Sequence, residues 1–252
     1  MEIHTTLSDR IAHVRLDRPP ANAMVTDFLK QIAARFHELE TDRSVAAIVL
    51  QGNGRTFSAG MDLKAAAELD ADGSDRIVLA FNEAFAAVYG TSKPVIGAIN
   101  GHAIAGGMVL ALCCDYRIGP DRDALFGLTE VRVGVPFPEV AYNVIADQLP
   151  PDTLRRMIQF GENMAPQEAL DRGALDELAA PRDVVGRTIE KAQHCLAIPP
   201  RGYADVKRQL RGDVMARNAA LVEKSWDRYL GAWLDDDARQ TARKLLAGGR
   251  AS

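Results

Sequence analysis

Several features that mark specialised classes of protein are missing or rare in this chain of 252 residues. It contains only three cysteines, Cys113, Cys114 and Cys195, and no CxxC pair, so we expect reduced thiols rather than a disulfide framework. Neither a run of Lys or Arg nor a basic tail is present, and 30 basic residues stand against 34 acidic ones, a net charge of -4. This balance argues against nucleic acid, or any other long polyanion, as a partner.

The sequence also offers no clear targeting or membrane segment. The N-terminal residues MEIHTTLSDR contain neither a basic leader nor an apolar core, so we expect no secretory signal and a cytoplasmic protein. Residues 94–114 carry no charged side chain and would be long enough to span a bilayer as one helix. Asn100, Gly101, His102 and Gly107 interrupt that segment with polar groups and helix breakers. We therefore expect a strand, a loop and a buried helix there, and no membrane partner.

The hydrophobic pattern favours an α/β fold. With 47% hydrophobic and 25% charged residues, the composition is typical of a globular protein, and the length fits one large core or one core with a small appendage. The expected strands are residues 3–7 and 11–16, which form a hairpin, and 46–51, 94–99, 116–119 and 124–128. The expected helices are residues 26–42, the stretch through Ile77, Phe81, Phe85 and Val88, and 138–149, 151–160, 166–172 and 181–195. Continuous apolar strands separated by helices predict a buried, mostly parallel sheet with right-handed crossovers.

The composition changes after Pro199 and Pro200, where strands disappear and residues 203–247 become helix-compatible and richly charged. We therefore expect two parts, 1–198 and 199–252. Within the second part, apolar residues recur at helical spacing. They are Val222, Trp226, Tyr229, Leu230 and Trp233. The pattern favours core packing or an oligomer contact over a cover above a ligand.

Patterns for phosphate loops, zinc proteases and serine hydrolases are missing. GxxxxGK[ST] and HExxH do not occur and the five histidines are scattered, so we expect no metal site. Ser58 lacks the preceding glycine of a nucleophile elbow, which argues against a serine hydrolase. The loop at 52–57 begins like a dinucleotide-binding loop but has Phe57 where the third glycine belongs.

Two segments, 58–63 and 103–108, share a form in which an apolar strand leads through small residues into a helix. Small residues let a ligand approach the backbone closely. If each loop aims one peptide N–H at a shared point, the pair forms an oxyanion hole, and a helix that starts at Gly106 adds the positive end of its dipole. The alternative is that Gly and Ala only permit tight turns and close packing of helix on strand.

Four motifs, in order and spacing, resemble those of the crotonase (enoyl-CoA hydratase/isomerase) superfamily. They are FSAGMDL (57–63), KPVIGAINGHAIAGG (93–107), CDYRI (114–118) and FGLTEVRVGVPFP (126–138). The resemblance runs from the first strand to about residue 180 and is weaker beyond. It implies a ββα spiral core with a helical C-terminal region for trimerisation, and a homotrimer or a dimer of trimers. It also implies an acyl-CoA thioester substrate, so that coenzyme A is part of the substrate and no separate cofactor is needed.

Residue by residue, the resemblance makes the N–H groups of Met61 and Gly106 the donors of the oxyanion hole. The other residues of the first loop are implied to line the path of coenzyme A: Ala59, Gly60, Asp62 and Leu63. Asp62 fits a hydrogen-bonding position of the loop better than a catalytic one, because turns commonly use Asp in this way.

The catalytic carboxylates depart from the hydratase pattern. Hydratases of the family use two glutamates; the first aligns with Val109, which can neither activate water nor move a proton, and the second aligns with Glu130. Without the resemblance, Glu130 would share a strand face with Arg132 as an exposed charged pair. One carboxylate beside an oxyanion hole suits transfer of a proton from the α to the γ carbon. The chain therefore looks most like the Δ3-Δ2 enoyl-CoA isomerases, with an apolar wall near Val109 and Phe137 that keeps water away.

Three points stay open at this stage. Glu139 fits a helix N-terminal charge better than a second catalytic acid. Lys207 is a candidate ligand for the phosphates of coenzyme A, although a solvated helix face explains it as well or better. Two alternatives to an isomerase remain: a hydratase or another acyl-CoA enzyme of this fold, and a CoA-thioester binding or scaffold protein without catalysis, which Val109 suggests.

Overall fold

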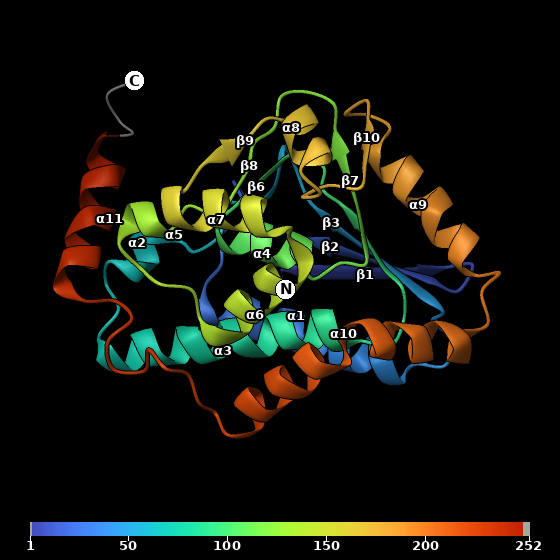
Figure 1. Ribbon diagram of the computed structural model, residues 1–252, viewed down its shortest axis with the longest axis horizontal. Helices are drawn as coiled ribbons and strands as arrows, with labels where there is room; N and C mark the ends of the chain where they lie inside the picture. The colour runs from blue at the N-terminus through green and yellow to red at the C-terminus, as the bar shows by residue number, and fades with distance from the viewer. Residues whose placement is uncertain (1, 249–252) are drawn as a thin grey trace.

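The computed structural model describes residues 2–248, with side chains as far as Lys244. The larger of its two sheets has six strands in the order β1-β2-β3-β5-β7-β10 (Figure 1). β1 and β2 form the expected hairpin and pair antiparallel, and every other neighbouring pair is parallel. The strands are β1 (Ile3–Ser8), β2 (Ile11–Leu16), β3 (Ala47–Gly52), β5 (Val95–Ala98), β7 (Tyr116–Pro120) and β10 (Glu177–Ala179). β5 is buried throughout and β3 nearly so, which explains their continuous apolar sequences.

A smaller sheet joins four short strands in the order β4-β6-β8-β9 within the described part of the chain. They are β4 (Thr56–Ser58), β6 (His102–Ile104), β8 (Phe126–Gly127) and β9 (Asn163–Met164). The expectation of plain loops at β4 and β6 is wrong, because strands of three residues are too short to show an alternation from which they could be predicted. β4 and β6 pair parallel, so the segments that follow them leave from the same edge of this sheet.

Helices cover both sheets (Figure 1). They are α1 (Thr26–Thr41), α2 (Leu63–Ala66), α3 (Ala71–Gly90), α4 (Gly106–Leu112), α5 (Glu130–Val133), α6 (Glu139–Gln148), α7 (Pro151–Phe160), α8 (Pro166–Asp171), α9 (Val184–Cys195), α10 (Pro200–Glu223) and α11 (Asp236–Gly248). The stretch 203–247 is therefore two helices with an irregular connection, and not one continuous helix. α1 begins at Thr26, as expected, with Val25 in the N-cap position.

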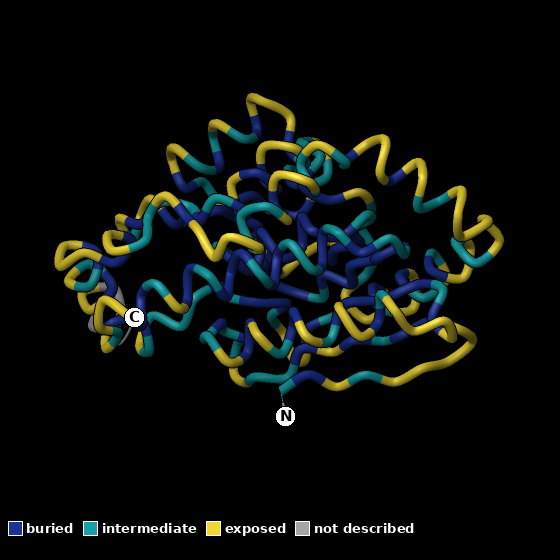
Figure 2. Tube along the Cα trace, turned by 90° about the horizontal axis from the view of Figure 1, so that it is seen from below, coloured by how far each residue is buried: buried dark blue, intermediate teal, exposed yellow. Residues whose placement is uncertain are grey.

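The core lies between the larger sheet and its helices, and Figure 2 shows the buried centre of the chain inside an exposed rim. The apolar positions predicted for α1 and α3 are buried there, among them Phe36, Phe81 and Phe85. Residues 94–114 form β5, β6 and α4, as expected for a strand followed by a buried helix. No helix within residues 2–248 is both long and apolar enough to cross a membrane.

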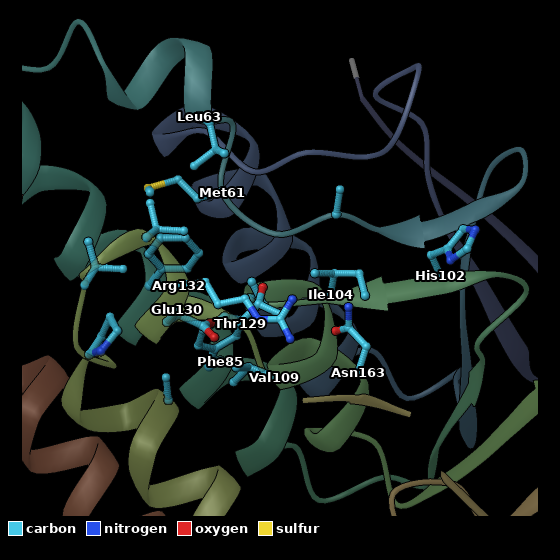
Figure 3. Close-up of a pocket in the computed structure, with 18 of the residues that line it drawn as sticks. Met61, Leu63, Phe85, His102, Ile104, Val109, Thr129, Glu130, Arg132 and Asn163 are labelled. Atoms are coloured by element: carbon cyan, nitrogen blue, oxygen red, sulfur yellow. The ribbon is translucent and has the colours of Figure 1, made fainter. Parts of the chain in front are cut away.

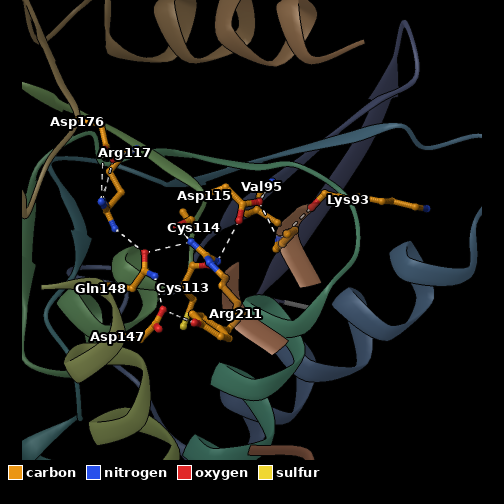
Figure 4. A network of polar contacts seen from close by, with 12 residues as sticks. Lys93, Val95, Cys113, Cys114, Asp115, Arg117, Asp147, Gln148, Asp176 and Arg211 are labelled. Carbon is orange, nitrogen blue, oxygen red and sulfur yellow. Dashed lines mark hydrogen bonds and ion pairs between the residues drawn. The ribbon is translucent and has the colours of Figure 1, made fainter. Parts of the chain in front are cut away.

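A buried cluster of charges connects α10 to the core (Figure 4). The Asp115 carboxylate accepts the Val95 N–H at 2.8 Å and pairs with Lys207 at 2.8 Å and Arg211 at 2.9 Å. The side chains of the two cations are only 5% and 9% exposed. Arg211 also donates to the carbonyl oxygen of Cys114 at 3.3 Å. One carboxylate therefore compensates two desolvated cations.

This arrangement predicts a large loss of stability in Asp115→Asn. The substitution leaves Lys207 and Arg211 buried without a counter-charge, which should lower the free energy of unfolding by about 3–5 kcal/mol in urea titrations. Asp205→Asn is the matched control, because Asp205 pairs with Arg208 at the exposed face of α10 and should cost at most about 1 kcal/mol. Equal losses in the two variants would contradict the assigned role of the buried cluster.

Candidate active site

The first loop of the site follows β4 and ends at a capped helix. The Asp62 carboxylate accepts the N–H groups of Lys64 and Ala65 at 3.1 and 3.2 Å and an Arg18 N–H at 3.0 Å. Burial opposes ionisation, but these hydrogen bonds hold the pKa of Asp62 below its usual value. Asp62 thus starts α2 and fixes the loop, in agreement with its expected hydrogen-bonding position.

The second loop follows β6 through a strained residue. Ala105 has φ 52° and ψ -129°, a conformation that costs a residue with a side chain about 1–3 kcal/mol. Its N–H donates to the Gly127 carbonyl oxygen at 2.7 Å, and α4 begins at the next residue. At Gly107 a Cβ atom would lie 2.1 Å from the Ser58 carbonyl oxygen, so only glycine allows the second loop to approach the first this closely.

The backbone N–H groups of Met61 and Gly106 are unused donors, one from each loop. A Cβ atom built on Gly60 would lie 2.9 Å from the Gly106 nitrogen, which shows how near the loops are. On either side of Met61, Met24 donates to the Gly60 carbonyl oxygen and accepts the Asp62 N–H. Among the hydrogen bonds within residues 2–248, none uses the N–H of Met61 or of Gly106. Both groups are therefore available to a ligand oxygen.

A cavity of about 370 Å³ lies beside these donors (Figure 3), a volume in the range of small-molecule sites. Its walls are mainly apolar and come from α3, α4 and the segment between α10 and α11. Phe85 and Val109 face it from α3 and α4. Trp233 closes another side, with its indole N–H bonded to the Pro136 carbonyl oxygen at 2.7 Å.

Glu130 carries the only carboxylate among the described residues that line this cavity. It is 8% exposed, and its Oε2 atom has no hydrogen-bond partner within residues 2–244. Burial raises the pKa of Glu130 to about 8. The side chain can thus be a neutral acid or a carboxylate near neutral pH, as proton transfer requires.

The expectation that Glu130 would lie on a strand is wrong. It begins α5, a single helical turn closed by Gly134 in the left-handed region at φ 81°. The alternative of an exposed charged pair with Arg132 is wrong as well, because Glu130 is buried and unpaired in the described part of the chain. The alternation in L-T-E-V-R-V is typical of a strand, but these residues form a single helical turn that ends at Gly134.

The cavity brings together six of the predicted site residues and leaves out five. Those that line it are Ala59, Met61, Leu63, Gly106, Val109 and Glu130. Gly60 and Asp62 do not line the cavity: Gly60 contacts the second loop, and Asp62 accepts the Ala65 N–H. Phe137 packs against the core. Glu139 is the first residue of α6 and pairs with Arg228 at 2.5 Å, so it is the helix N-terminal charge that the sequence favours.

The expectation that Lys207 lies on a solvated helix face is wrong. Its side chain is 5% exposed and its Nζ atom bonds the Asp115 carboxylate and the Lys93 carbonyl oxygen. The ammonium group is thus engaged inside the fold, and a contact with the phosphates of coenzyme A stays a prediction. The sequence could not reveal this burial, since Asp115 is 92 residues away along the chain.

Several lining residues were not predicted to belong to the site. They are His102, Thr129, Arg132, Asn163 and Trp233. Trp233 lay in the apolar stripe that was assigned to core packing or an oligomer contact; it packs edge-on against Phe81 with ring centroids 6.0 Å apart and also faces the cavity. Trp233 is 3% exposed and belongs to the core, as the sequence favours, while its use as a cover above a ligand stays a prediction.

Comparisons with known proteins agree with this geometry. A sequence model of the enoyl-CoA hydratase/isomerase family matches residues 6–241. Probable enoyl-CoA hydratase EchA17 of Mycobacterium tuberculosis is 32% identical over 197 residues, which cover 78% of this chain and 75% of that protein. Carnitinyl-CoA dehydratase of Escherichia coli is 31% identical over 210 residues, 83% of this chain and 80% of that protein.

A solved structure confirms the expected crotonase-like fold. Human mitochondrial Δ3-Δ2-enoyl-CoA isomerase superposes with a TM-score of 0.90 at 23% identity, and the match covers 100% of this chain and 99% of the human one.

The burial of Glu130 predicts a pH-dependent gain of stability in Glu130→Gln. The folded protein holds a proton on Glu130 up to a pKa of about 8, whereas the ordinary value is 4.5. The stability that this proton provides is complete below pH 4.5 and is lost as the pH rises through 8, by at most about 1.4 kcal/mol per pH unit. Glu130→Gln cannot ionise at this position and should escape this loss. Its free energy of unfolding in urea, measured at about pH 5, 6.5 and 8, should therefore exceed that of the wild type by an amount that grows with pH.

Glu68→Gln is the control for this measurement, because Glu68 is exposed. A difference between wild type and Glu130→Gln that stays constant from the lowest to the highest pH would show that Glu130 is ionised in the fold throughout.

Proposed function

This chain belongs to the enoyl-CoA hydratase/isomerase family, and within that family we propose that it is an enoyl-CoA isomerase of fatty-acid or related acyl-CoA metabolism. The reaction moves a β,γ double bond of an acyl-CoA thioester to the α,β position. One observation carries the proposal: a single buried carboxylate, Glu130, faces the cavity beside two unused N–H donors, while Val109 stands where a hydratase has its other glutamate.

The proton transfer uses Glu130 twice, first as a base and then as an acid. Ionised Glu130 takes a proton from the α carbon, and the electrons of that C–H bond form a double bond to the thioester carbon while the carbonyl π electrons move onto oxygen. When the oxygen electrons re-form the carbonyl, the pair between the thioester carbon and the α carbon becomes the α,β double bond, and the β,γ pair takes the proton back from Glu130 at the γ carbon. Between the two steps the thioester is an enolate, whose oxygen accepts the N–H groups of Met61 and Gly106. Such donors act most strongly where charge develops in a site that excludes water. Glu130 returns to its starting state and no other acid is required.

Hydration is the second candidate, and the geometry favours it less. Adding water needs a group that activates the water as well as one that protonates carbon. Val109 cannot do so, and Glu139 is engaged by Arg228 and lies outside the cavity lining. A CoA-thioester binding protein without catalysis is the third candidate, but a carboxylate with a pKa of about 8 is poised for proton transfer rather than for binding alone.

Turnover by Glu130→Gln tests the isomerase directly. Loss of the base should lower kcat by about 10²–10⁴, while Glu68→Gln retains wild-type rates. The assay follows conjugation of a 3-enoyl-CoA and hydration of a 2-enoyl-CoA separately. In the wild type, kcat/KM for conjugation should rise with pH and level off with a midpoint near 8, the pKa of Glu130. Hydration without conjugation would overturn the isomerase, and binding without either reaction would support the non-catalytic candidate.

We also propose that the protein acts in the cytoplasm as a homotrimer or a dimer of trimers. Val206 and Leu210 on α10 are 54% and 77% exposed, and a second copy of the chain would remove this apolar surface from water. Light scattering at micromolar concentration should give about three or six times the mass of one chain. In Leu210→Asp the mass should fall toward that of one chain, whereas a monomeric wild type would contradict the proposal.

A further inference from the structure

The lining of the cavity is of two kinds. Leu125, Arg132 and Asn163 are exposed, so the cavity opens to solvent beside them. Other lining residues are apolar and at most 5% exposed. They are Phe81, Phe85, Val109, Val135, Ala141 and Trp233 (Figure 3). An apolar group gains most by lying against this buried part of the wall, where it leaves water completely.

The buried part of the wall begins directly beside the oxyanion donors. A Cβ atom built on Gly106 would lie 3.2 Å from Cε1 of Phe81, so the Phe81 ring lies against the Gly106 backbone. The Trp233 ring packs edge-on against Phe81, with the centroids 6.0 Å apart. A single ring therefore separates Gly106 from Trp233. A thioester oxygen bound at Gly106 leaves room for only a short acyl chain along this wall.

Hydrogen bonds fix the segment that carries Trp233. Its indole N–H donates to the Pro136 carbonyl oxygen at 2.7 Å. Asp227, earlier in the same segment and 2% exposed, accepts the Glu139 N–H at 2.7 Å and the Asn82 amide N–H at 2.9 Å. Asp227 thus joins the segment to the N-terminus of α6 and to α3, both of which line the cavity. A longer acyl chain could not displace this wall without breaking buried hydrogen bonds.

We propose that Trp233 ends the acyl site, so that the preferred substrates are CoA thioesters of short acyl chains. The charges of coenzyme A are costly to bury, so this part of the substrate stays at the exposed lining and the acyl chain takes the buried apolar part. The cavity volume of about 370 Å³ agrees, because it is near the lower limit of small-molecule sites, which have about 300–1,000 Å³. This inference rests on the proposed function in one respect: the N–H groups of Met61 and Gly106 bind the thioester oxygen.

Binding of unreactive, saturated ligands tests the limit without turnover. Calorimetry of butanoyl-, hexanoyl-, octanoyl- and decanoyl-CoA measures how affinity depends on chain length. Each further buried methylene should tighten binding by about fourfold, and in the wild type this gain should end at hexanoyl-CoA. In Trp233→Ala the gain should continue, so that decanoyl-CoA binds at least about tenfold more tightly than hexanoyl-CoA.

Two further variants complete the test. Trp233→Ala removes a buried ring and should lower stability, so Ala141→Leu provides a second test of opposite sign: its larger side chain fills the acyl site, and the gain should end at butanoyl-CoA. Trp226→Phe is the matched control, because Trp226 is 48% exposed and does not line the cavity, and it should keep the wild-type profile. It also leaves Trp233 as the sole tryptophan of the chain. Hexanoyl-CoA, but not free coenzyme A, should then change the tryptophan fluorescence.

Three outcomes would overturn the inference. They are a steady rise of wild-type affinity through decanoyl-CoA, a wild-type profile in folded Trp233→Ala or Ala141→Leu, and no change of Trp233 fluorescence with hexanoyl-CoA. Turnover of 3-hexenoyl- and 3-decenoyl-CoA separates this inference from the isomerase. A chain-length limit in binding without turnover contradicts only the isomerase, and turnover without that limit contradicts only the role of Trp233.

Discussion

The contact between two backbone loops is the constraint on which this site depends. β4 and β6 lie parallel in the smaller sheet, with Ser58 opposite Ala103, so both loops leave the sheet at one edge. They then approach until a single Cβ atom at Gly107 would collide with the Ser58 carbonyl oxygen. At this separation the N–H groups of Met61 and Gly106, one from each loop, make no hydrogen bond within the described residues. The donors are thus fixed by main-chain packing, which a substrate oxygen cannot distort easily.

The same fold treats two partly or fully buried acids in opposite ways. Asp115 accepts a backbone N–H and pairs with two cations. Glu130 faces a mainly apolar cavity and forms no ion pair within residues 2–244, and burial raises its pKa to about 8. The first arrangement holds α10 to the core. The second keeps a proton available at neutral pH at the expense of stability, as sites that tune an acid commonly do.

The sequence predicted those elements whose pattern is determined locally. The continuous apolar runs of β3 and β5 and the helical spacing of α1 and α3 each follow from burial, whereas the small residues after the strands left open whether donors or tight packing were at stake, and only the resemblance pointed to Met61 and Gly106. What the sequence missed depends partly on distant partners. The helical turn at Glu130 ends at Gly134 in the left-handed region, a local feature that the strand-like alternation outweighed. The burial of Lys207 needs Asp115, and Trp233 reaches the cavity only because the chain leaves the helix after Glu223. Periodicity along the chain contains none of this information.

The C-terminal helices belong to the site more closely than their composition suggests. Arg211 donates to the carbonyl oxygens of Cys113 and Cys114, directly after α4, whose other end begins with Gly106. A helix of seven residues is about 10 Å long and behaves as a short rigid rod. Holding its C-terminal end therefore restricts the position of the Gly106 N–H at its start. The charge cluster at α10 and the donor in the cavity are two ends of one element, so the packing that stabilises the fold also sets the geometry of the proposed chemistry.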